Sequence, residues 1–465
     1  MENPKLYDWM VVVFLHEIFE DQDASRQMEE AIRKAGCSGN IVVFMVRDDI
    51  TVDQATGLFS FKLTVLQLES APTMGRSRFK PVHSPDLQIN NPDRHCWETA
   101  FKYIYSNFYA ERNMIISFSH GAAYGINRNT GTVLRPKNQM ELMALQNASL
   151  TLKSNKYYWL DKKETNQVEE KGYHFPLNEG LRSNEGSAIE KTAQMDLCKN
   201  LEILWMSELA DALDRCLPGG YIDVFLMVNC YMQLFDNGYT LSKKVKFLVA
   251  PEGGFTAKGY DFGKLMQRLG DSPDMPSEAL VTYILKDLKS LYERDGNISE
   301  LLSMTLFANR LKFYPLALKA FEGFIELLID NMALVKGELR DIRNNQIHIV
   351  TGDDRLPLID AGIWIKLVAE QCSKKINRLT VYSDFFVSLH KKIVINYLVT
   401  DTLRQKDEDF PINFGYTGLS LFYPQSAIKK DEQSVVWCAN FDPSIPAPFQ
   451  KNSKWNLFLD RYFLP

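Results

Sequence analysis

The chain has 465 residues and a mass of 53.5 kDa, which allows roughly three domains of about 150 residues or one enlarged domain. Apolar residues make up 45% of it and charged residues 24%, a globular composition that excludes a disordered or low-complexity scaffold. With 53 basic and 58 acidic side chains, the net charge of −5 provides no basic surplus for binding nucleic acid. Seven cysteines are too few for a disulfide scaffold and fit a reducing environment.

The sequence contains no segment that predicts membrane insertion or secretion. The longest uninterrupted apolar run, Trp9 to Leu15, is much shorter than the ~20 residues that span a bilayer. The first eight residues carry both signs of charge, and no small-residue cleavage signal follows the apolar run. We therefore expect a cytoplasmic protein without a membrane partner.

The first third of the chain alternates apolar runs of strand length with amphipathic segments. Trp9 to Leu15 is a β-branched run that is apolar on both faces, as in a buried parallel strand. Apolar residues then recur with helical spacing from Ala24 to Ala35, and Ile41 to Val46 is the next strand. This alternation predicts a parallel α/β sheet covered by helices on both faces. It continues with a helix from Trp97 to Phe108, a strand from Met114 to Phe118, a helix from Ser207 to Cys216, and strands at Ile222–Val228 and Val245–Ala250.

The rest of the chain divides into an insertion and a helical region. Residues 127–200 are polar and mixed in charge, which indicates an inserted loop, with room for a hairpin. We expect an α/β domain over 1–270 that contains this insertion, and a mainly helical domain over 271–465 packed on it. The expected helices are Pro276–Tyr292, Pro315–Asn345, Ile359–Cys372, Val381–Thr402 and Trp455–Phe463, with a strand at Gly418–Pro424.

Two of the apolar strands end in residues that can carry chemistry. His120 and Gly121 follow Met114–Phe118, and Cys230 follows Ile222–Val228. The carboxyl ends of parallel strands face the ligand crevice of an open sheet, so the two side chains would share one edge if the strands are neighbours. A thiolate is a strong nucleophile, and an imidazole can act as its acid/base partner. The alternative is structural, because a cysteine that ends an apolar run is usually buried in the core.

The blocks around these residues resemble the clostripain family of cysteine peptidases, which has the caspase-like fold of the caspase–gingipain–legumain clan. Members of this clan carry one apolar block ending in His-Gly and another ending in Cys. Clostripain relatives continue roughly as Asp-Ala-Cys-Leu-Met, Val-Ala-Ser-Glu-Glu and a Gly-Asp-Gly-Trp loop. The corresponding segments here are Val228–Met232, Val249–Gly253 and Ala257–Tyr260. The opening strand–helix–strand unit, Thr417–Pro424 and the closing helix are also similar.

The resemblance implies a caspase-like, mostly parallel sheet flanked by helices, with a helical C-terminal region. It assigns Cys230 as nucleophile and His120 as acid/base, with the backbone N–H groups of Gly121 and Cys230 binding the oxyanion. It implies no cofactor. Calcium dependence occurs in the family, but no oxygen-rich loop here indicates a calcium site, and no cluster has the spacing of zinc ligands.

The sequence departs from the family in the substrate pocket. Relatives cleave after Arg or Lys and use two carboxylates, which correspond to Val228 and Lys258 here. Without these acids a substrate cation loses its charged partner, so we predict that the P1 residue is not Arg or Lys. Lys258 could instead bind an acidic P1 side chain, or it could point into solvent. Glu252, which follows the fifth strand, is a further pocket candidate or a cation ligand.

The insertion raises the question of activation. Relatives are often cleaved between the parts that carry the His and the Cys, and residues 127–200 lie there. A pocket for acidic residues would make Asp161, Glu164, Glu169 and Glu170 candidate self-cleavage sites. A passive insertion or a binding surface is the alternative. The partners expected are a protein or peptide substrate and an activating partner.

Three functions fit these patterns. The leading hypothesis is a bacterial-type cysteine endopeptidase. A catalytically inactive, caspase-like interaction or regulatory protein is the second, and another hydrolase or acyltransferase on the same sheet is the third. His16 and Asp223 are better explained as structural. The adjacent His95 and Cys96 are not expected to form a catalytic dyad, because neighbouring residues diverge on a helix, and His174 has no identifiable partner.

Overall fold

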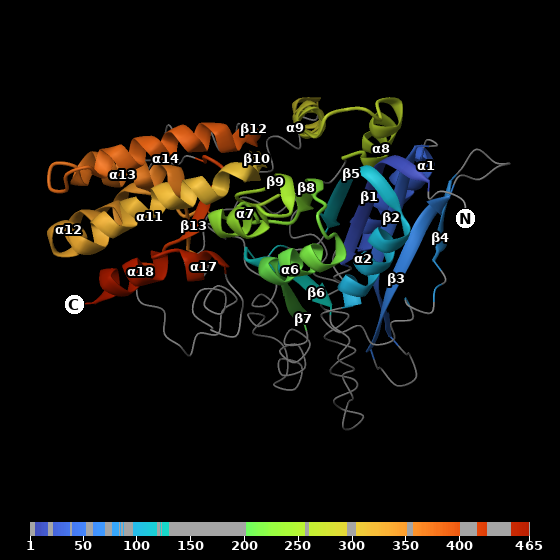
Figure 1. The fold of residues 1–465 in the computed structure, drawn as a ribbon, viewed down its shortest axis with the longest axis horizontal. Helices are drawn as coiled ribbons and strands as arrows, with labels where there is room; N and C mark the ends of the chain where they lie inside the picture. Colours follow the sequence, from blue (N-terminus) through green and yellow to red (C-terminus); the bar gives the residue numbers. More distant parts are fainter. Residues whose placement is uncertain are drawn as a thin grey trace, which may run out of the picture.

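A computed structural model shows a nine-stranded sheet that extends from the middle of the molecule, at β12 and β10, to one side, at β3 and β4 (Figure 1). Strands β2, β1, β5, β8 and β9 lie side by side in this order and are all parallel. The outer strands β3 and β10 run in the opposite direction to their inner neighbours. The sheet is therefore mostly parallel, as predicted. The structure describes residues 5–16, 22–37, 40–52, 59–69, 77–82, 84, 87, 96–118, 121, 123–129, 201–255, 260–294, 304–350, 357–399, 416–425 and 448–464.

The five parallel strands form because their sequences are apolar on both faces. Along β1, Val11 and Val13 face one apolar core while Val12 and Phe14 face the other, and all four are buried. Residues with this alternation bury both sides of the sheet. The strands of the sheet are β1 (Leu6–His16), β2 (Ile41–Val52), β3 (Phe59–Glu69), β4 (Arg78–Pro81), β5 (Tyr109–Phe118), β8 (Ile222–Val228), β9 (Val245–Ala250), β10 (Thr305–Arg310) and β12 (Val394–Val399).

Helices cover both faces of the sheet. The two cores separate the helices into a set with α1, α8 and α9 on one face and a set with α2, α6 and α7 on the other (Figure 1). This confirms the predicted fold class. These helices are α1 (Gln22–Ala35), α2 (Cys96–Asn107), α6 (Met206–Cys216), α7 (Phe235–Leu241), α8 (Phe262–Asp271) and α9 (Ser277–Arg294).

The later part of the chain supplies helices and also extends the sheet. Strands β10 and β12 add to β9, so the sheet continues past residue 270, where we expected a separate helical domain to begin. The expected helix Val381–Thr402 ends at Ile393, because the β-branched Val394 and Ile395 continue as strand β12. The helices here are α11 (Tyr314–Asp330), α12 (Met332–Asp341), α13 (Ala361–Cys372), α14 (Leu379–Ile393), α17 (Pro448–Asn452) and α18 (Trp455–Phe463).

Two small antiparallel ladders complete the described part. β6 (Gly125–Asn129) pairs with β7 (Leu201–Trp205), so the two ends of the insertion lie side by side. β11 (Leu358–Asp360) pairs with β13 (Ser420–Phe422), and an isolated bridge joins Ser420 to Leu234, beyond β8. The strand predicted near Gly418–Pro424 is therefore present and lies next to the segment that follows Cys230.

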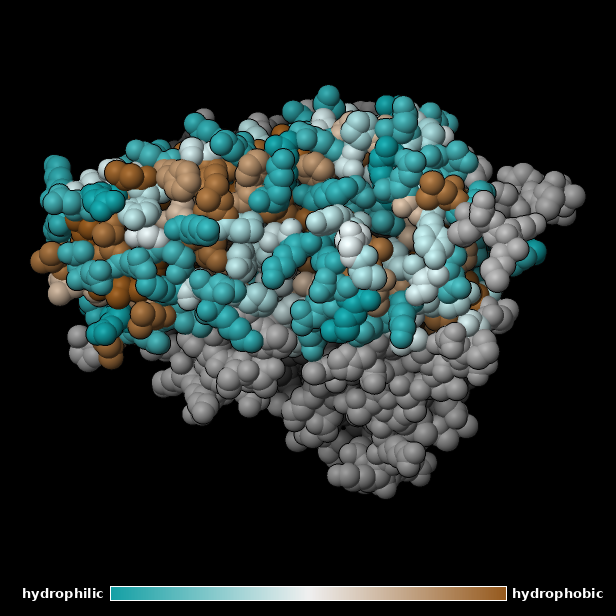
Figure 2. Space-filling model, in the orientation of Figure 1, coloured by the Kyte–Doolittle hydropathy of each residue, from teal (hydrophilic) through white to brown (hydrophobic). Residues whose placement is uncertain are grey.

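The surface of the molecule is mainly hydrophilic on the face that Figure 2 displays, and apolar side chains gather there over the C-terminal helices. No helix among the described residues is both long enough and apolar enough to cross a bilayer.

Candidate active site

The two strands that precede the candidate catalytic residues are neighbours in the sheet. β5 and β8 are parallel, and their register pairs Phe118 with Val228. His120 and Cys230 each follow two residues after this pair in the sequence. The expectation that these strands end at the same edge of the sheet is confirmed, although His120 itself lies outside the described residues.

Gly121 lies directly on the backbone of Cys230. A Cβ atom added to Gly121 would be 1.8 Å from the carbonyl oxygen of Cys230 and 2.8 Å from its nitrogen. Real Cβ atoms do not approach other atoms this closely, so only glycine fits here. Gly121 also forms an isolated bridge with Ile126. The chain that leaves β5 is therefore held against the residue proposed as the nucleophile.

Both loops at this edge contain a residue in the left-handed backbone region. Ala123 and Tyr231 have φ values of 62°, and Tyr231 follows Cys230 directly. Non-glycine residues adopt this conformation rarely, and such strain is concentrated at functional sites. The surrounding structure must hold both loops in place.

The thiol of Cys230 is half-buried and contacts the backbone of Phe255. The Phe255 N–H donates to Sγ at 3.3 Å, and Sγ lies 3.5 Å from the Phe255 carbonyl oxygen. The N–H can donate to the thiolate, and the carbonyl can accept from the thiol, so the Phe255 backbone holds the sulfur in place in either form. This contact has no signal in the sequence, because Phe255 carries no polar side chain.

Asn237 joins the two loops. It lies on α7 and is 1% exposed, and its Nδ2 donates to the carbonyl of Ala123 at 2.6 Å and to that of Met232 at 2.9 Å. One side chain thus fixes the loop after β5 relative to the loop after Cys230. This role was not predicted, because an asparagine in the short segment Phe235–Leu241, which mixes polar and apolar residues, is not distinctive in the sequence.

The loop after Cys230 is also held by the segment that follows β9. The Tyr231 N–H donates to the carbonyl of Gly253, and the Gln233 N–H donates to that of Pro251, both at 2.9 Å. Glu252 lies between these two acceptors and is completely buried. Its burial, and secondly the neighbouring Asp360, raises the pKa of Glu252 well above that of an ordinary carboxyl group. The prediction that Glu252 lines the substrate pocket gains no support from this placement, since its carboxylate faces the interior.

Of the two positions that carry pocket carboxylates in clostripain relatives, the structure describes Val228, which is apolar. Val228 is 7% exposed and belongs to the same buried cluster as Tyr260 and Phe262, with Phe255 packed against it. No carboxylate therefore occupies this position. Lys258 and the candidate self-cleavage sites Asp161, Glu164, Glu169 and Glu170 lie outside the described residues, as do His95 and His174.

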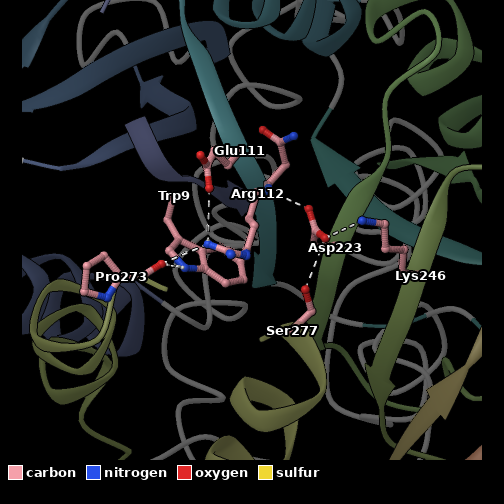
Figure 3. A network of polar contacts seen from close by, with 8 residues as sticks. Trp9, Glu111, Arg112, Asp223, Lys246, Pro273 and Ser277 are labelled. Carbon is pink, nitrogen blue, oxygen red and sulfur yellow. Dashed lines mark hydrogen bonds and ion pairs between the residues drawn. The ribbon is translucent and has the colours of Figure 1, made fainter. Parts of the chain in front are cut away.

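Asp223 has a structural role far from the strand ends that carry Gly121 and Cys230. At the start of β8 its carboxylate accepts from the Asn113 N–H at 2.9 Å, from Lys246 Nζ at 2.7 Å and from the Ser277 hydroxyl at 3.1 Å (Figure 3). Trp9 Nε1 and Arg112 Nη1, on the adjoining strands, both donate to the carbonyl of Pro273 at 3.0 Å (Figure 3). This network ties α9 and the turn before it to the amino ends of the strands.

The described residues contain no group of three or more His, Cys, Asp or Glu side chains that could hold a metal ion. Among the described residues, Cys37, Cys216, Cys230 and Cys372 are not in disulfide bonds.

Comparison with known proteins connects these features to one family. Residues 181–321 match the sequence model of the clostripain family, a segment that contains Cys230 and Lys258 but not His120. No curated protein matches the chain in sequence.

Solved structures match over nearly the whole chain. A secreted C11 cysteine protease from Bacteroides thetaiotaomicron, in complex with an irreversible peptide inhibitor, has a TM-score of 0.53 at 11% identity and covers 97% of this chain and 99% of its own. An inactive zymogen C11 protease from Parabacteroides distasonis has a TM-score of 0.52 at 13% identity, with 91% and 94% covered. At these identities the shared property is the fold. The match to the clostripain family model and the shared fold together support a cysteine endopeptidase.

Proposed function

We propose that this clostripain-like chain is a cysteine endopeptidase in which Cys230 is the nucleophile and His120 the acid/base. The observation that carries the proposal is the backbone of Gly121 lying against that of Cys230 at the ends of two neighbouring parallel strands. Parallel strands bring together residues that follow them, and ligand sites form at this edge of such sheets. The strained backbone of Ala123 and Tyr231 at the same place supports a functional site.

The chemistry follows from the groups at this edge. The Cys230 thiolate attacks the carbonyl carbon of the scissile bond, and the resulting oxyanion is bound by the backbone N–H groups of Gly121 and Cys230. The C–N bond breaks as His120 donates a proton to the leaving amine, which leaves a thioester on Cys230. His120 then takes a proton from water, which attacks the thioester and releases the acid and the thiolate. The Phe255 N–H is placed to donate to the sulfur at both ends of this cycle.

The pocket is proposed not to select Arg or Lys at P1. The support is the apolar Val228, which is packed with Tyr260 in a buried cluster and offers no charge to a cation. Lys258 is proposed to favour an acidic P1 side chain instead. If Lys258 does not face the pocket, we expect a preference for an apolar P1 residue instead.

A panel of fluorogenic peptides that differ only at P1 tests both parts. The purified protein should hydrolyse at least one of them, and Cys230→Ala should reduce the rate to background. Rapid cleavage after Arg or Lys would contradict the pocket proposal while leaving the peptidase in place. If no peptide is hydrolysed and Cys230 reacts no faster than other cysteines, the inactive interaction protein is the better account.

Processing within residues 127–200 is part of the proposal. The support is that the two ends of this insertion meet in the β6–β7 ladder, so a cut between them would leave both fragments joined in the fold. Asp161, Glu164, Glu169 and Glu170 are the proposed sites. Wild type incubated beside Cys230→Ala should yield two fragments on a denaturing gel, and mass spectrometry should place the new ends. An intact wild-type chain in the presence of active peptidase would contradict self-processing.

The cytoplasmic location and the absence of a cofactor also remain proposals. Hydrolysis as described needs only protein groups and water, so a calcium chelator should leave the rate unchanged. The neighbour in complex with the peptide inhibitor is described as secreted. Fractionation of cells that express the full chain would decide the location of this protein.

A further inference from the structure

The buried side chain of Glu252 forms hydrogen bonds with a distant segment of the chain. It is 0% exposed, its Oε2 accepts from the Gly418 N–H at 2.8 Å, and its Oε1 accepts from the Ser420 hydroxyl at 3.0 Å. Gly418 has a φ of 86°, and a Cβ there would be 2.5 Å from the ring of Phe307, so glycine is required at this position. The side chain of Glu252 therefore attaches the segment after β9 to a segment 166 residues later.

Asp360 holds the same later segment from the other side. It is 1% exposed, and its Oδ1 accepts from the hydroxyl of Thr417 and from the Ile363 N–H, both at 2.8 Å. The Thr417 N–H donates to its other oxygen, and the backbones of Asp360 and Ser420 are paired in the β11–β13 ladder. Both carboxyl groups therefore converge on residues 417–420.

These contacts continue into the loop that carries the nucleophile. Pro251 and Gly253, which flank Glu252, accept the N–H groups of Gln233 and Tyr231. The carbonyl of Gln233 in turn accepts from the Ser420 N–H at 3.0 Å. The loop that carries Cys230, the segment 251–253 and residues 417–420 are thus connected by a closed ring of hydrogen bonds. A change in the side chain of Glu252 should therefore alter the position of Cys230.

The surroundings of Glu252 within this ring favour its protonated form. Burial raises the pKa of Glu252 first of all, and Asp360 adds to this both as a like charge and through a side-chain hydrogen bond. Other titratable groups on the packed elements include Tyr314, whose pKa is raised mainly by burial and in part by Glu252, and His390, whose Nε2 lies 2.7 Å from the Thr417 carbonyl.

We propose that Glu252 and Asp360 are a positioning pair, which fixes the nucleophile loop, residues 229–234, on residues 416–423. The pair touches neither substrate nor reacting atoms and acts through the backbone of Tyr231 and Gln233. This inference rests on the proposed function, because it concerns the loop of Cys230. It makes the C-terminal part of the chain a component of the active site.

Loss of the proton from Glu252 would place two buried negative charges close together and weaken the attachment, so activity should have an alkaline limit. Glu252→Gln keeps one acceptor oxygen and stays uncharged at any pH. Asp360→Asn retains an acceptor on one side only, and its amide NH2 faces a backbone N–H on the other, because both oxygens of Asp360 accept hydrogen bonds in the wild type. Glu252→Ala removes the attachment altogether.

The experiment compares these three variants with wild type and with Glu322→Gln. Glu322 is a matched control, because it is a partly buried acid with a raised pKa that accepts the Lys454 N–H away from the nucleophile loop. We measure kcat and KM for the best peptide, and the rate at which iodoacetamide modifies Cys230, from about pH 5 to pH 9. Glu252→Ala should lower kcat by about 10- to 100-fold with little change in KM. Glu252→Gln should keep most of the neutral activity and move the alkaline limit upward, Asp360→Asn should lower kcat with little change in KM, and Glu322→Gln should follow wild type.

Two results would overturn the positioning pair. One is an alkaline limit in Glu252→Gln that coincides with that of wild type. The other is wild-type kcat in a folded Glu252→Ala or Asp360→Asn protein. If Glu252→Ala does not fold, the two isosteric variants still decide. If wild type hydrolyses no peptide, the proposed function fails, and the ratio of Cys230 modification rates in Glu252→Gln and wild type decides the pair separately: a constant ratio across the pH range counts against it.

Discussion

Gly121 is the residue at which the geometry of the site is most sensitive to a single atom. The Cβ of Gly121→Ala would overlap the Cys230 carbonyl at 1.8 Å, so one of the two loops must move. A displacement of about 1 Å at the reacting groups costs on the order of 100-fold in rate, and we expect peptide hydrolysis to fall by at least that factor. Kinetics of the purified variant test this.

Gly337→Ala serves as the matched control for Gly121→Ala. Gly337 lies on the exposed side of α12 with no atom within 4 Å of its added Cβ. Alanine should therefore leave activity unchanged and stabilise the helix by up to about 1 kcal/mol. Equal activity of Gly121→Ala and wild type would show that the two loops are not in the contact described.

Asn237 is expected to act through the loops that it joins. Asn237→Leu has a similar volume but no donor, so the buried carbonyls of Ala123 and Met232 lose their partner, at a cost of about 1–3 kcal/mol each. We predict a lower midpoint of urea unfolding together with a fall in kcat of about tenfold or more. Asn331→Ala is a control, since its Nδ2 donates to a carbonyl on α11, that of Leu327. A variant at 237 with reduced stability but unchanged kcat would limit Asn237 to a structural role.

At the scale of elements, α7 is attached to α17 through a buried acid. Asp236 accepts from Gln450 Nε2 at 2.6 Å and from the Thr240 hydroxyl at 3.1 Å, and burial raises its pKa to about 6. Its folded pKa lies above the ordinary value of 3.8, so its contribution to stability is complete below that value and is lost as the pH rises through 6. The loss amounts to about 3 kcal/mol at most.

Asp236→Asn should remove this slope, because an amide keeps the hydrogen bonds and does not ionise. The free energy of urea unfolding is measured for both proteins at several values between about pH 4 and pH 8. We expect the free energy of unfolding of the variant to rise relative to that of wild type as the pH rises. A difference between the two proteins that stays constant with pH would mean that Asp236 titrates normally in the folded state.

The sequence predicted elements well where one physical signal dominated. The strands β1, β2, β5, β8 and β9 are β-branched runs that are apolar on both faces, and such runs have few alternatives. Strand β12 was missed because it continues α14 without a glycine or proline between them, and edge strands lack the apolar alternation of buried ones. The burial of Glu252 was not predicted for a similar reason: its position after β9 can be read from the sequence, but the direction in which its side chain points cannot.

At the scale of the whole molecule, the C-terminal region completes the sheet and the site. β10 and β12 cover the edge of β9, and the buried core that contains Met232 and Phe235 also contains Phe321 and Phe386 from α11 and α14. A chain that ends at residue 270 would leave the edge of β9 unpaired. It would also expose the apolar side chains of this core that pack against the missing helices. We predict that it is insoluble or unfolds without cooperativity, as followed by circular dichroism. A cooperative transition with native-like ellipticity would show that residues 1–270 are an independent domain.

The central claim is that the sulfur of Cys230 and the imidazole of His120 act together on peptide bonds. It is tested most directly by mass spectrometry after brief exposure to a pool of peptides that carry a thiol-reactive ketone. Burial raises the pKa of the Cys216 and Cys372 thiols to about 11, so these should react slowly. We predict one adduct per chain, located at Cys230, absent from Cys230→Ala and formed much more slowly by His120→Ala. Adducts spread over Cys37, Cys216 and Cys372, or a rate at Cys230 that is independent of His120, would contradict the account.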